Sequence, residues 1–210
     1  MTAPRRLDHR AALEQYRRRA PVYDAELTLF EPLRSRAVAA LELAPGATVL
    51  DLGCGTGLSL PLLEAALGRD GRIIGVEQCP EMLARARRRA AESGWGNLEL
   101  ICEPVESACL EGQADAALFH FTHDILQSEG ALRNVLAHLK PGARVVALGL
   151  QWAPPWAVPA NVFVLGAALH SVSSLAGLDC PWRGLARLLG EWEVETLWGG
   201  SVFLARGRRQ

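Results

Sequence analysis

The chain has 210 residues, half of them hydrophobic and 21% charged, so it is long and apolar enough to bury the core of one ordinary domain. Its formal net charge of -1 argues against a protein built around nucleic acid. No stretch of about 18 residues is apolar without interruption, so no membrane span is expected.

Cysteine usage indicates the compartment. The five cysteines form no CxxC pair, their number is odd, and no metal-ligand spacing appears. We therefore expect reduced thiols in a cytoplasmic protein, and no metal site. The first ten residues, MTAPRRLDHR, carry charge but no apolar segment, so they do not predict a secretory signal.

The region before residue 45 predicts helices. Two helical stretches are expected, at about residues 8–19 and 25–42. Arg17, Arg18 and Arg19 lie in the first of them and could attract anionic lipid head groups. The apolar face of that stretch is thin, so a solvated helix surface is favoured over contact with a membrane surface.

Short runs rich in valine, isoleucine and leucine alternate with longer stretches of helical period from residue 45 to 150. Most of the runs are continuously apolar, as in parallel strands that are covered on both faces. Strands are expected at 48–53, 72–77, 98–102, 115–121 and 144–150, and crossover helices at 58–67, 80–93 and 129–139. This order predicts a Rossmann-like, doubly wound α/β fold with right-handed crossovers.

The segment after residue 150 differs in composition. Within 152–178, the prolines and the internal His and Ser residues favour a buried helix with a proline-rich start. The stretches EWEVETLW (191–198) and SVFLARGRR (201–209), separated by two glycines, predict a β-hairpin that closes the sheet. The expected sheet therefore has seven strands, most of them parallel.

The sequence VLDLGCGTG, residues 49–57, joins the first strand to a glycine-rich loop. In open α/β sheets, ligands bind beyond the carboxyl ends of the strands. Gly53, Gly55 and Gly57 permit positive φ and let the backbone approach a ligand closely. The last glycine comes one residue earlier than in the dinucleotide fingerprint GxGxxG, and Asp51 would repel a pyrophosphate but attract a cation.

VLDLGCGTG closely resembles the first motif of the class I S-adenosylmethionine-dependent methyltransferases, and the resemblance extends over residues 45–150. It implies S-adenosyl-L-methionine as the cofactor and S-adenosyl-L-homocysteine as the product. It also implies cofactor contacts at these positions of the loop: Asp51, Gly53, Cys54, Gly55 and Gly57. The alternative interpretation is a generic Rossmann-like turn for another nucleotide.

Glu77 ends the strand at 72–77 and is the second landmark of the expected cofactor site. A carboxylate at this place can accept hydrogen bonds from both ribose hydroxyls. Gln78 is expected to touch adenine through its side chain or its backbone, and the resemblance implies that Met82 packs on one adenine face. The alternatives are a solvated charge for Glu77 and ordinary core packing for Met82.

The adenine side of the expected site departs from the family pattern. Many relatives carry an acid after the third strand that receives the adenine amino group, whereas this chain reads CEPVES, with Pro104 in that place. We therefore expect the backbone of Val105 to hold the base, with Glu103 or Glu106 as possible substitutes. A lower affinity for the cofactor is consistent with this departure.

The stretch FHFTHDIL, residues 119–126, follows the fourth strand and is expected to border the sulfonium side of the pocket. His120 and His123 are candidate general bases, because a histidine near neutral pKa can remove a proton from a hydroxyl or an ammonium group. The alternative is that one of them hydrogen-bonds the loop and the other stacks near the cofactor. His120 is therefore also a candidate cofactor contact.

The stretch YRRRAPVYDAEL, residues 16–27, resembles a segment of menaquinone- or ubiquinone-type methyltransferases and of bacterial phosphatidylethanolamine N-methyltransferases. The resemblance implies a lid that folds over the cofactor with a tyrosine near its methionine end. Tyr23 is the first candidate for this contact and for a catalytic role, and Tyr16 is the second candidate for the contact. The alternative is that both are packing aromatics.

One domain, residues 1–210, follows from these expectations. It comprises a helical lid (1–44), a cofactor-binding core (45–150), an acceptor-side cover (151–190) and a closing hairpin (191–210). In the cover, Trp152, Trp156 and Phe163 could wall an apolar acceptor pocket or shield the edge of the sheet.

The predicted function is methyl transfer from S-adenosylmethionine to a small, fairly apolar molecule. One alternative is a methyltransferase-like scaffold that binds the cofactor without turnover. Another is a nicotinamide-dependent oxidoreductase, against which Asp51 and the early third glycine argue. A nucleic-acid substrate is disfavoured, because no Asn-Pro-Pro-Tyr-like stretch for a flipped base follows the fourth strand.

Overall fold

A seven-stranded sheet forms the centre of the computed structural model, which describes residues 28–171 and 174–210. Its strand order is β3-β2-β1-β4-β5-β7-β6. The predictions for the helix at 8–19, for the arginines at 17–19 and for Tyr16 and Tyr23 lie outside the described residues. The Rossmann-like doubly wound sheet is confirmed.

Five strands run parallel and the last two close the sheet as an antiparallel hairpin. The strands are β1 (Thr48–Leu52), β2 (Arg72–Val76), β3 (Leu98–Ile101), β4 (Ala114–His120), β5 (Leu139–Leu150), β6 (Trp192–Leu197) and β7 (Val202–Arg208). At the turn of the hairpin, Gly199 and Gly200 have φ of 64° and 93°, so the predicted glycine turn is confirmed.

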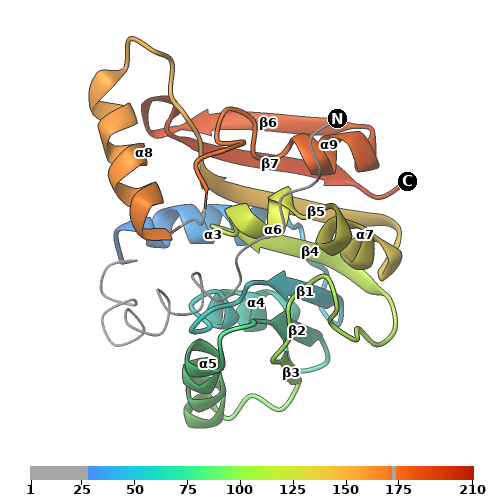
Figure 1. The fold of residues 1–210 in the computed structure, drawn as a ribbon. Helices are drawn as coiled ribbons and strands as arrows, with labels where there is room; N and C mark the ends of the chain where they lie inside the picture. Colours follow the sequence, from blue (N-terminus) through green and yellow to red (C-terminus); the bar gives the residue numbers. More distant parts are fainter. Residues whose placement is uncertain (1–27, 172–173) are drawn as a thin grey trace.

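Helices cover both faces of the sheet (Figure 1). They are α3 (Glu31–Ala40), preceded by the 3-10 turn η1 (Thr28–Phe30), α4 (Leu60–Leu67), α5 (Pro80–Ser93), α6 (His123–Gln127), α7 (Glu129–Ala137), α8 (Val158–Ser171) and α9 (Arg183–Leu189). One core lies under α3, α4 and α8, and the other under α6, α7 and α9.

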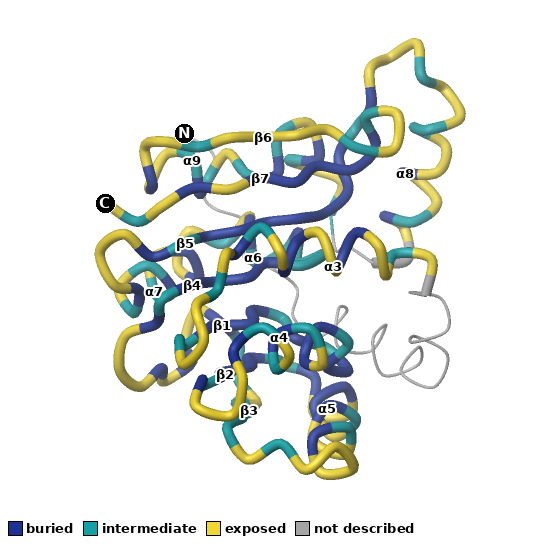
Figure 2. Tube along the Cα trace, turned by 180° about the vertical axis from the view of Figure 1, so that it is seen from behind, coloured by how far each residue is buried: buried dark blue, intermediate teal, exposed yellow. Residues whose placement is uncertain are grey.

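The continuous apolar runs read from the sequence are explained by these two cores. In β1, Val49 contributes to the first core, whereas Leu50 and Leu52 contribute to the second, because successive side chains of a strand point to opposite faces. Both sides are therefore dry, and the buried residues follow the central strands in Figure 2.

Two predicted boundaries shift at the start of β5. The helix expected at 129–139 ends at Ala137, and Leu139 already pairs with Ala114 of β4. The pairing then skips to Ala116 opposite Arg144, a bulge that contains Gly142 with φ of 81°. Glycine at that position allows the chain to leave the helix and enter the strand within a few residues.

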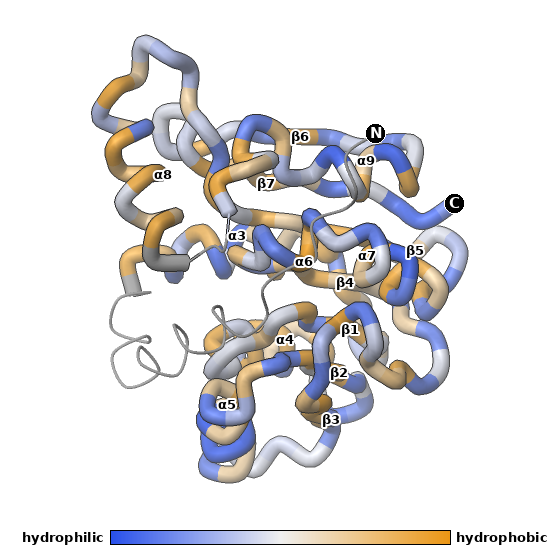
Figure 3. The backbone as a smooth tube through the Cα atoms, viewed as in Figure 1, coloured by the Kyte–Doolittle hydropathy of each residue, from blue (hydrophilic) through white to orange (hydrophobic). Residues whose placement is uncertain are grey.

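The prediction of a buried helix within 152–178 is wrong for α8. Among residues 158–169 of this helix only Val164 and Ala168 are buried, while an apolar stripe is exposed to solvent. Figure 3 shows hydrophobic residues along the helix. The stripe consists of Val158, Val162, Leu165 and Leu169. The reason is the position of α8, which stands beside one end of the sheet, so only one side of the helix meets the core (Figure 1).

In the described part of the chain, no helix has the length and apolar character needed to cross a membrane.

Glycine at the end of α5 permits a direct test of the fold. Gly94 follows this helix with φ of 69° and ψ of 27°, and its amide donates to the carbonyl groups of the last turn. We expect Gly94→Ala to lower the free energy of unfolding by about 1 kcal/mol, because an L-residue is strained in this conformation. Urea denaturation measures the change.

Gly96 provides the matched control for this substitution. It lies two residues further on, has no positive φ, and a Cβ added there meets no atom within 4 Å. Gly96→Ala is therefore expected to leave the stability unchanged or to raise it slightly. Equal destabilisation by both substitutions would contradict the left-handed helix end at Gly94.

Candidate functional site

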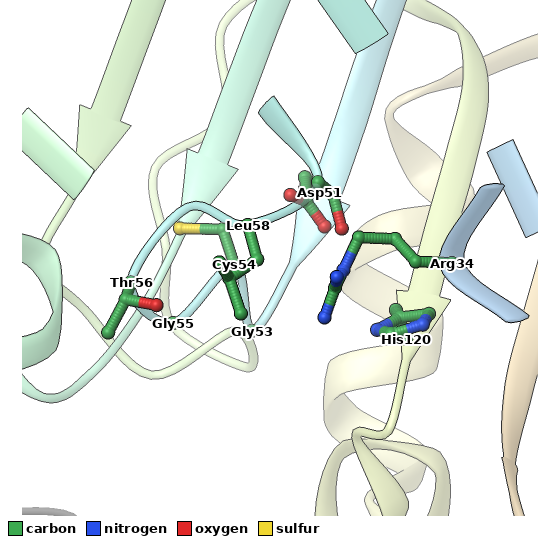
Figure 4. A pocket seen from close by; sticks show the side chains of 9 residues that line it. Arg34, Asp51, Gly53, Cys54, Gly55, Thr56, Leu58 and His120 are labelled. Atoms are coloured by element: carbon green, nitrogen blue, oxygen red, sulfur yellow. The ribbon is translucent and has the colours of Figure 1, made fainter. Parts of the chain in front are cut away.

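A cavity opens beside the carboxyl end of β1, next to its neighbour β4 (Figure 4). This is where the strand order of the sheet reverses, the usual place for a ligand in a doubly wound fold. Arg34, Asp51 and His120 line the cavity together with the loop that follows β1.

The glycine loop has the backbone that its sequence predicts. Gly53, Gly55 and Gly57 have φ of 71°, 57° and 79°. A Cβ on Gly53 would lie 2.6 Å from Cγ2 of Thr122, and one on Gly57 would lie 2.6 Å from Cδ1 of Leu60. Two of the three glycines are therefore also required because the loop packs closely against its own protein.

Asp51 is the central charge of the cavity. Its side chain is buried, and its Oδ2 atom has no hydrogen-bond partner among the described residues. Burial, and to a smaller extent the negative charge of Glu77, raise the pKa of this carboxyl to about 7, although the positive charge of Arg34 opposes the rise. Near neutral pH a cation that binds beside Asp51 would therefore stabilise the charged form of its carboxyl group.

Arg34 is a functional candidate that sequence reasoning missed. It is buried on α3, pairs with Glu31, and points toward Asp51 and His120 in Figure 4. Its Nε atom has no partner within the described chain. The sequence does hold a signal for Arg34. It lies beside Leu33 on the side of α3 that faces the core, where an arginine is rare unless it has a polar partner.

His120 reaches the cavity from the end of β4. Its Nε2 atom is buried without a partner in the described ranges. Burial, together with the positive charge of Arg34, lowers the pKa of His120 to about 3. The imidazole is therefore neutral at physiological pH, where it can accept a hydrogen bond.

His123 occupies a different environment from His120. It begins α6, and its Nε2 atom lies 2.9 Å from the carbonyl oxygen of Ala176, to which it donates when that nitrogen carries the proton. Burial lowers its pKa, against the raising effects of this hydrogen bond and of Asp124. The residue is not part of the cavity lining.

Glu77 joins the glycine loop to the end of β2. Its carboxylate accepts hydrogen bonds from the amide of Gly55 at 3.1 Å and from that of Cys79 at 2.7 Å. Burial raises its pKa, while these amides lower it. Cys54 donates its own amide to the carbonyl of Val76, and burial raises the pKa of its thiol, so it is an inert packed cysteine.

The residues expected around adenine lie beyond the ends of β2 and β3. Met82 is buried on α5. Val105 is also buried, and its carbonyl accepts a hydrogen bond from Asn134 at 2.8 Å. The two alternative acids are engaged locally, Glu103 with the amide of Cys109 at 3.2 Å and Glu106 with the hydroxyl of Ser128 at 3.1 Å.

The three aromatic residues expected near the acceptor differ in burial and in ring contacts within the described residues. Phe163 stacks on Phe30 with ring centroids 6.3 Å apart. Trp152 is partly buried against the core, whereas Trp156 is 81% exposed. Only Phe163 therefore belongs to an aromatic cluster.

Comparisons with known proteins support the resemblance to methyltransferases. Residues 49–142 match the family described as "Methyltransferase domain". The chain is 31% identical over 141 residues to a 2-phytyl-1,4-naphtoquinone methyltransferase of Thermosynechococcus vestitus, covering 63% of this chain and 61% of that protein. It is 35% identical over 119 residues to an uncharacterised transposon protein of Streptomyces fradiae, covering 54% of this chain and 33% of that one.

Solved structures share the fold over more of the chain. The N-methyltransferase NodS of Bradyrhizobium japonicum, in complex with S-adenosyl-L-homocysteine, has a TM-score of 0.69 at 16% identity and matches 94% of this chain and 98% of its own. An O-methyltransferase family protein of Burkholderia thailandensis has a TM-score of 0.70 at 16% identity, over 99% of this chain and 64% of its own. The chain spans less than two thirds of the length of the curated relatives named above. The resemblance found in VLDLGCGTG is confirmed.

The raised pKa of Asp51 predicts how stability depends on pH. Between about pH 4 and about pH 7 the folded protein keeps a proton that the unfolded chain releases. The contribution of Asp51 to the free energy of unfolding therefore falls as the pH rises through this window, by at most about 4 kcal/mol, whereas the lowered pKa of His120 makes its contribution rise. We expect Asp51→Asn to remove the falling contribution, so that in urea denaturation from pH 4 to pH 7 the stability of the variant rises more steeply with pH than that of wild type.

Asp115 serves as the matched control with the opposite sign. Burial opposes the shift, but hydrogen bonds from Lys140 and from the amide of Thr48 lower the pKa of Asp115. The contribution of Asp115 to the free energy of unfolding therefore rises with pH through the acid range, and Asp115→Asn should remove that rise, the opposite of the effect of Asp51→Asn. If wild type and Asp51→Asn showed the same slope from pH 4 to pH 7, the buried-carboxylate description would be wrong.

Proposed function

We propose that the chain is a class I S-adenosylmethionine-dependent methyltransferase that transfers a methyl group from S-adenosyl-L-methionine to a small, fairly apolar molecule, a proposal that the matching family and relatives support. The relative from Thermosynechococcus, which is named for a phytyl-substituted naphthoquinone, supports an apolar acceptor. The near-neutral net charge of -1 supports a small molecule over nucleic acid.

The pairing of Asp51 with Arg34 is the observation that carries the proposal. These two buried side chains of opposite charge face one cavity, and each has a polar atom without a partner in the described structure. A free amino-acid end has an ammonium and a carboxylate group, which would satisfy Asp51 and Arg34 respectively. Asp51 gains full charge when an ammonium group approaches, because the pKa of a carboxyl falls beside a cation.

Other residues of the site fit the nucleoside end. Glu77 lies beside the glycine loop, and each of its oxygens has a further lone pair for a ribose hydroxyl. Met82 and the backbone at Val105 would bind adenine, with Gln78 beside them. When bound, the cofactor supplies an electrophilic methyl group. The chain's own contribution is to hold both partners in a fixed relative orientation, with the neutral His120 as a hydrogen-bond acceptor.

Removing the Arg34 charge tests this assignment. We expect Arg34→Gln to weaken the binding of S-adenosyl-L-homocysteine by about 10- to 100-fold, the usual effect of losing a charge-assisted hydrogen bond. The binding of 5'-methylthioadenosine, which lacks the amino-acid end, should stay unchanged. Titration calorimetry of both ligands at pH 7.5 measures the two effects.

Arg72 supplies the control. It lies in β2, pairs with Glu99 and is partly exposed. Arg72→Gln should leave both affinities at the wild-type value. If Arg34→Gln weakened both ligands equally, the arginine would support the cavity without binding the carboxylate.

Turnover separates an enzyme from a scaffold. We expect labelled methyl groups to pass from S-adenosylmethionine to members of a panel of apolar phenol, quinol and amine acceptors. Binding of the cofactor without transfer to any of them would favour the scaffold. Tight binding of NADH, with no binding of S-adenosylmethionine, would instead favour an oxidoreductase and overturn the proposal.

A further inference from the structure

Four aromatic rings from separate parts of the chain meet near the end of the sheet. They are Phe30 of η1, Phe121 directly after β4, Phe163 of α8, and Trp198 of the turn between β6 and β7. Phe30 is central: its ring centroid lies 5.0 Å from Phe121 in an edge-on arrangement, and 5.4 Å from Trp198 and 6.3 Å from Phe163 in stacked arrangements. We call these four residues the aromatic cluster.

The backbone holds two of these rings in an unfavourable conformation. Phe121 and Trp198 have φ of 56° and 49°, a region that bulky residues rarely adopt. Fixed contacts keep them there: the amide of Phe121 donates to the carbonyl of Leu148 at 2.8 Å, and the hydroxyl of Ser201 donates to the carbonyl of Trp198 at 2.8 Å. Retained strain of this kind is concentrated at functional sites.

The cluster is also incompletely buried. Phe163 is 38% exposed and Trp198 is 44% exposed, whereas the aromatic residues of the core, such as Phe203, are almost fully buried. Because the rings of Phe163 and Trp198 keep this much contact with solvent, they are better suited to bind an apolar ligand than to fill a protein core.

His120 connects the aromatic cluster to the cavity. Its ring lies edge-on to Phe121 with centroids 4.8 Å apart, and it lines the same cavity as Asp51 and Arg34. Its buried Nε2 atom lacks a hydrogen-bond partner in the part of the chain that the structure describes. His120 thus joins the cavity to the Phe121 ring of the cluster, and Phe30 in turn joins Phe121 to the exposed rings of Phe163 and Trp198.

We propose that the methyl acceptor is a planar aromatic molecule with a hydroxyl group, whose ring packs on the aromatic cluster and whose hydroxyl donates a hydrogen bond to Nε2 of His120. The proposal rests on the proposed function and specifies its substrate class.

Binding of 2-naphthol tests the proposal without requiring knowledge of the natural acceptor. Naphthalene has the same rings without the hydroxyl, and decahydro-2-naphthol has the hydroxyl without aromatic rings. Their dissociation constants are measured by nuclear magnetic resonance titration of the full chain saturated with S-adenosyl-L-homocysteine. We expect 2-naphthol to bind at least about fivefold more tightly than either analogue, since one hydrogen bond and ring stacking each contribute on that scale.

Variants assign the two contacts to residues. Trp198→Leu and Phe163→Leu should each weaken 2-naphthol about 5- to 10-fold, and Trp198→Phe should recover most of the loss. His120→Phe should abolish the preference for 2-naphthol over naphthalene while leaving naphthalene binding intact. Trp156→Leu is the matched control, because Trp156 is 81% exposed and has no ring contact with the cluster among the described residues.

The outcomes separate this inference from the proposed function. If S-adenosyl-L-homocysteine fails to bind, the proposed function fails. If it binds and the cluster variants, shown to be folded by their circular dichroism, bind 2-naphthol like wild type, the aromatic cluster is not the acceptor site. A preference for decahydro-2-naphthol or for a naphthylmethyl-ammonium ion over 2-naphthol would likewise overturn the inference.

Discussion

The burial of an acid and a base at the point where the sheet reverses its strand order is the constraint on which the site depends. Asp51 is brought there by β1, a strand whose two faces are both dry, and Arg34 arrives from α3 on the covering layer. Among the residues that the structure describes, neither charged group has all of its polar atoms paired. Such an arrangement opposes folding and is expected where a charged ligand completes the pairing.

The glycine loop is built around this constraint. Its left-handed glycines let the chain turn sharply after Asp51, and two of them leave room for Thr122 and Leu60 to pack against the loop. Glu77 then holds the loop through the amide of Gly55. The same residues thus shape the cavity and connect it to the next strand, so a change that disturbs one function disturbs the other.

The aromatic cluster shows how the outer part of the site is assembled from pieces that are remote in sequence. Phe30 precedes α3, Phe163 lies on α8 and Trp198 on the closing hairpin, and they meet only because these elements converge near the same end of the sheet (Figure 1). The acceptor site that we propose therefore depends on η1, α8 and the hairpin turn more than on the strands of the sheet.

Local patterns in the sequence determined the alternation of strands and helices, the hairpin with its glycine turn, the left-handed backbone of the loop, and the place of Asp51 at a strand end. These follow from periodicity and from the conformational freedom of glycine, which neighbours along the chain decide. The tertiary structure alone decided that Arg34 faces Asp51, that His120 is neutral, that α8 keeps an apolar stripe in solvent, and that four distant rings meet. Desolvation and charge interactions depend on which groups approach through space, and no spacing along the chain specifies that approach.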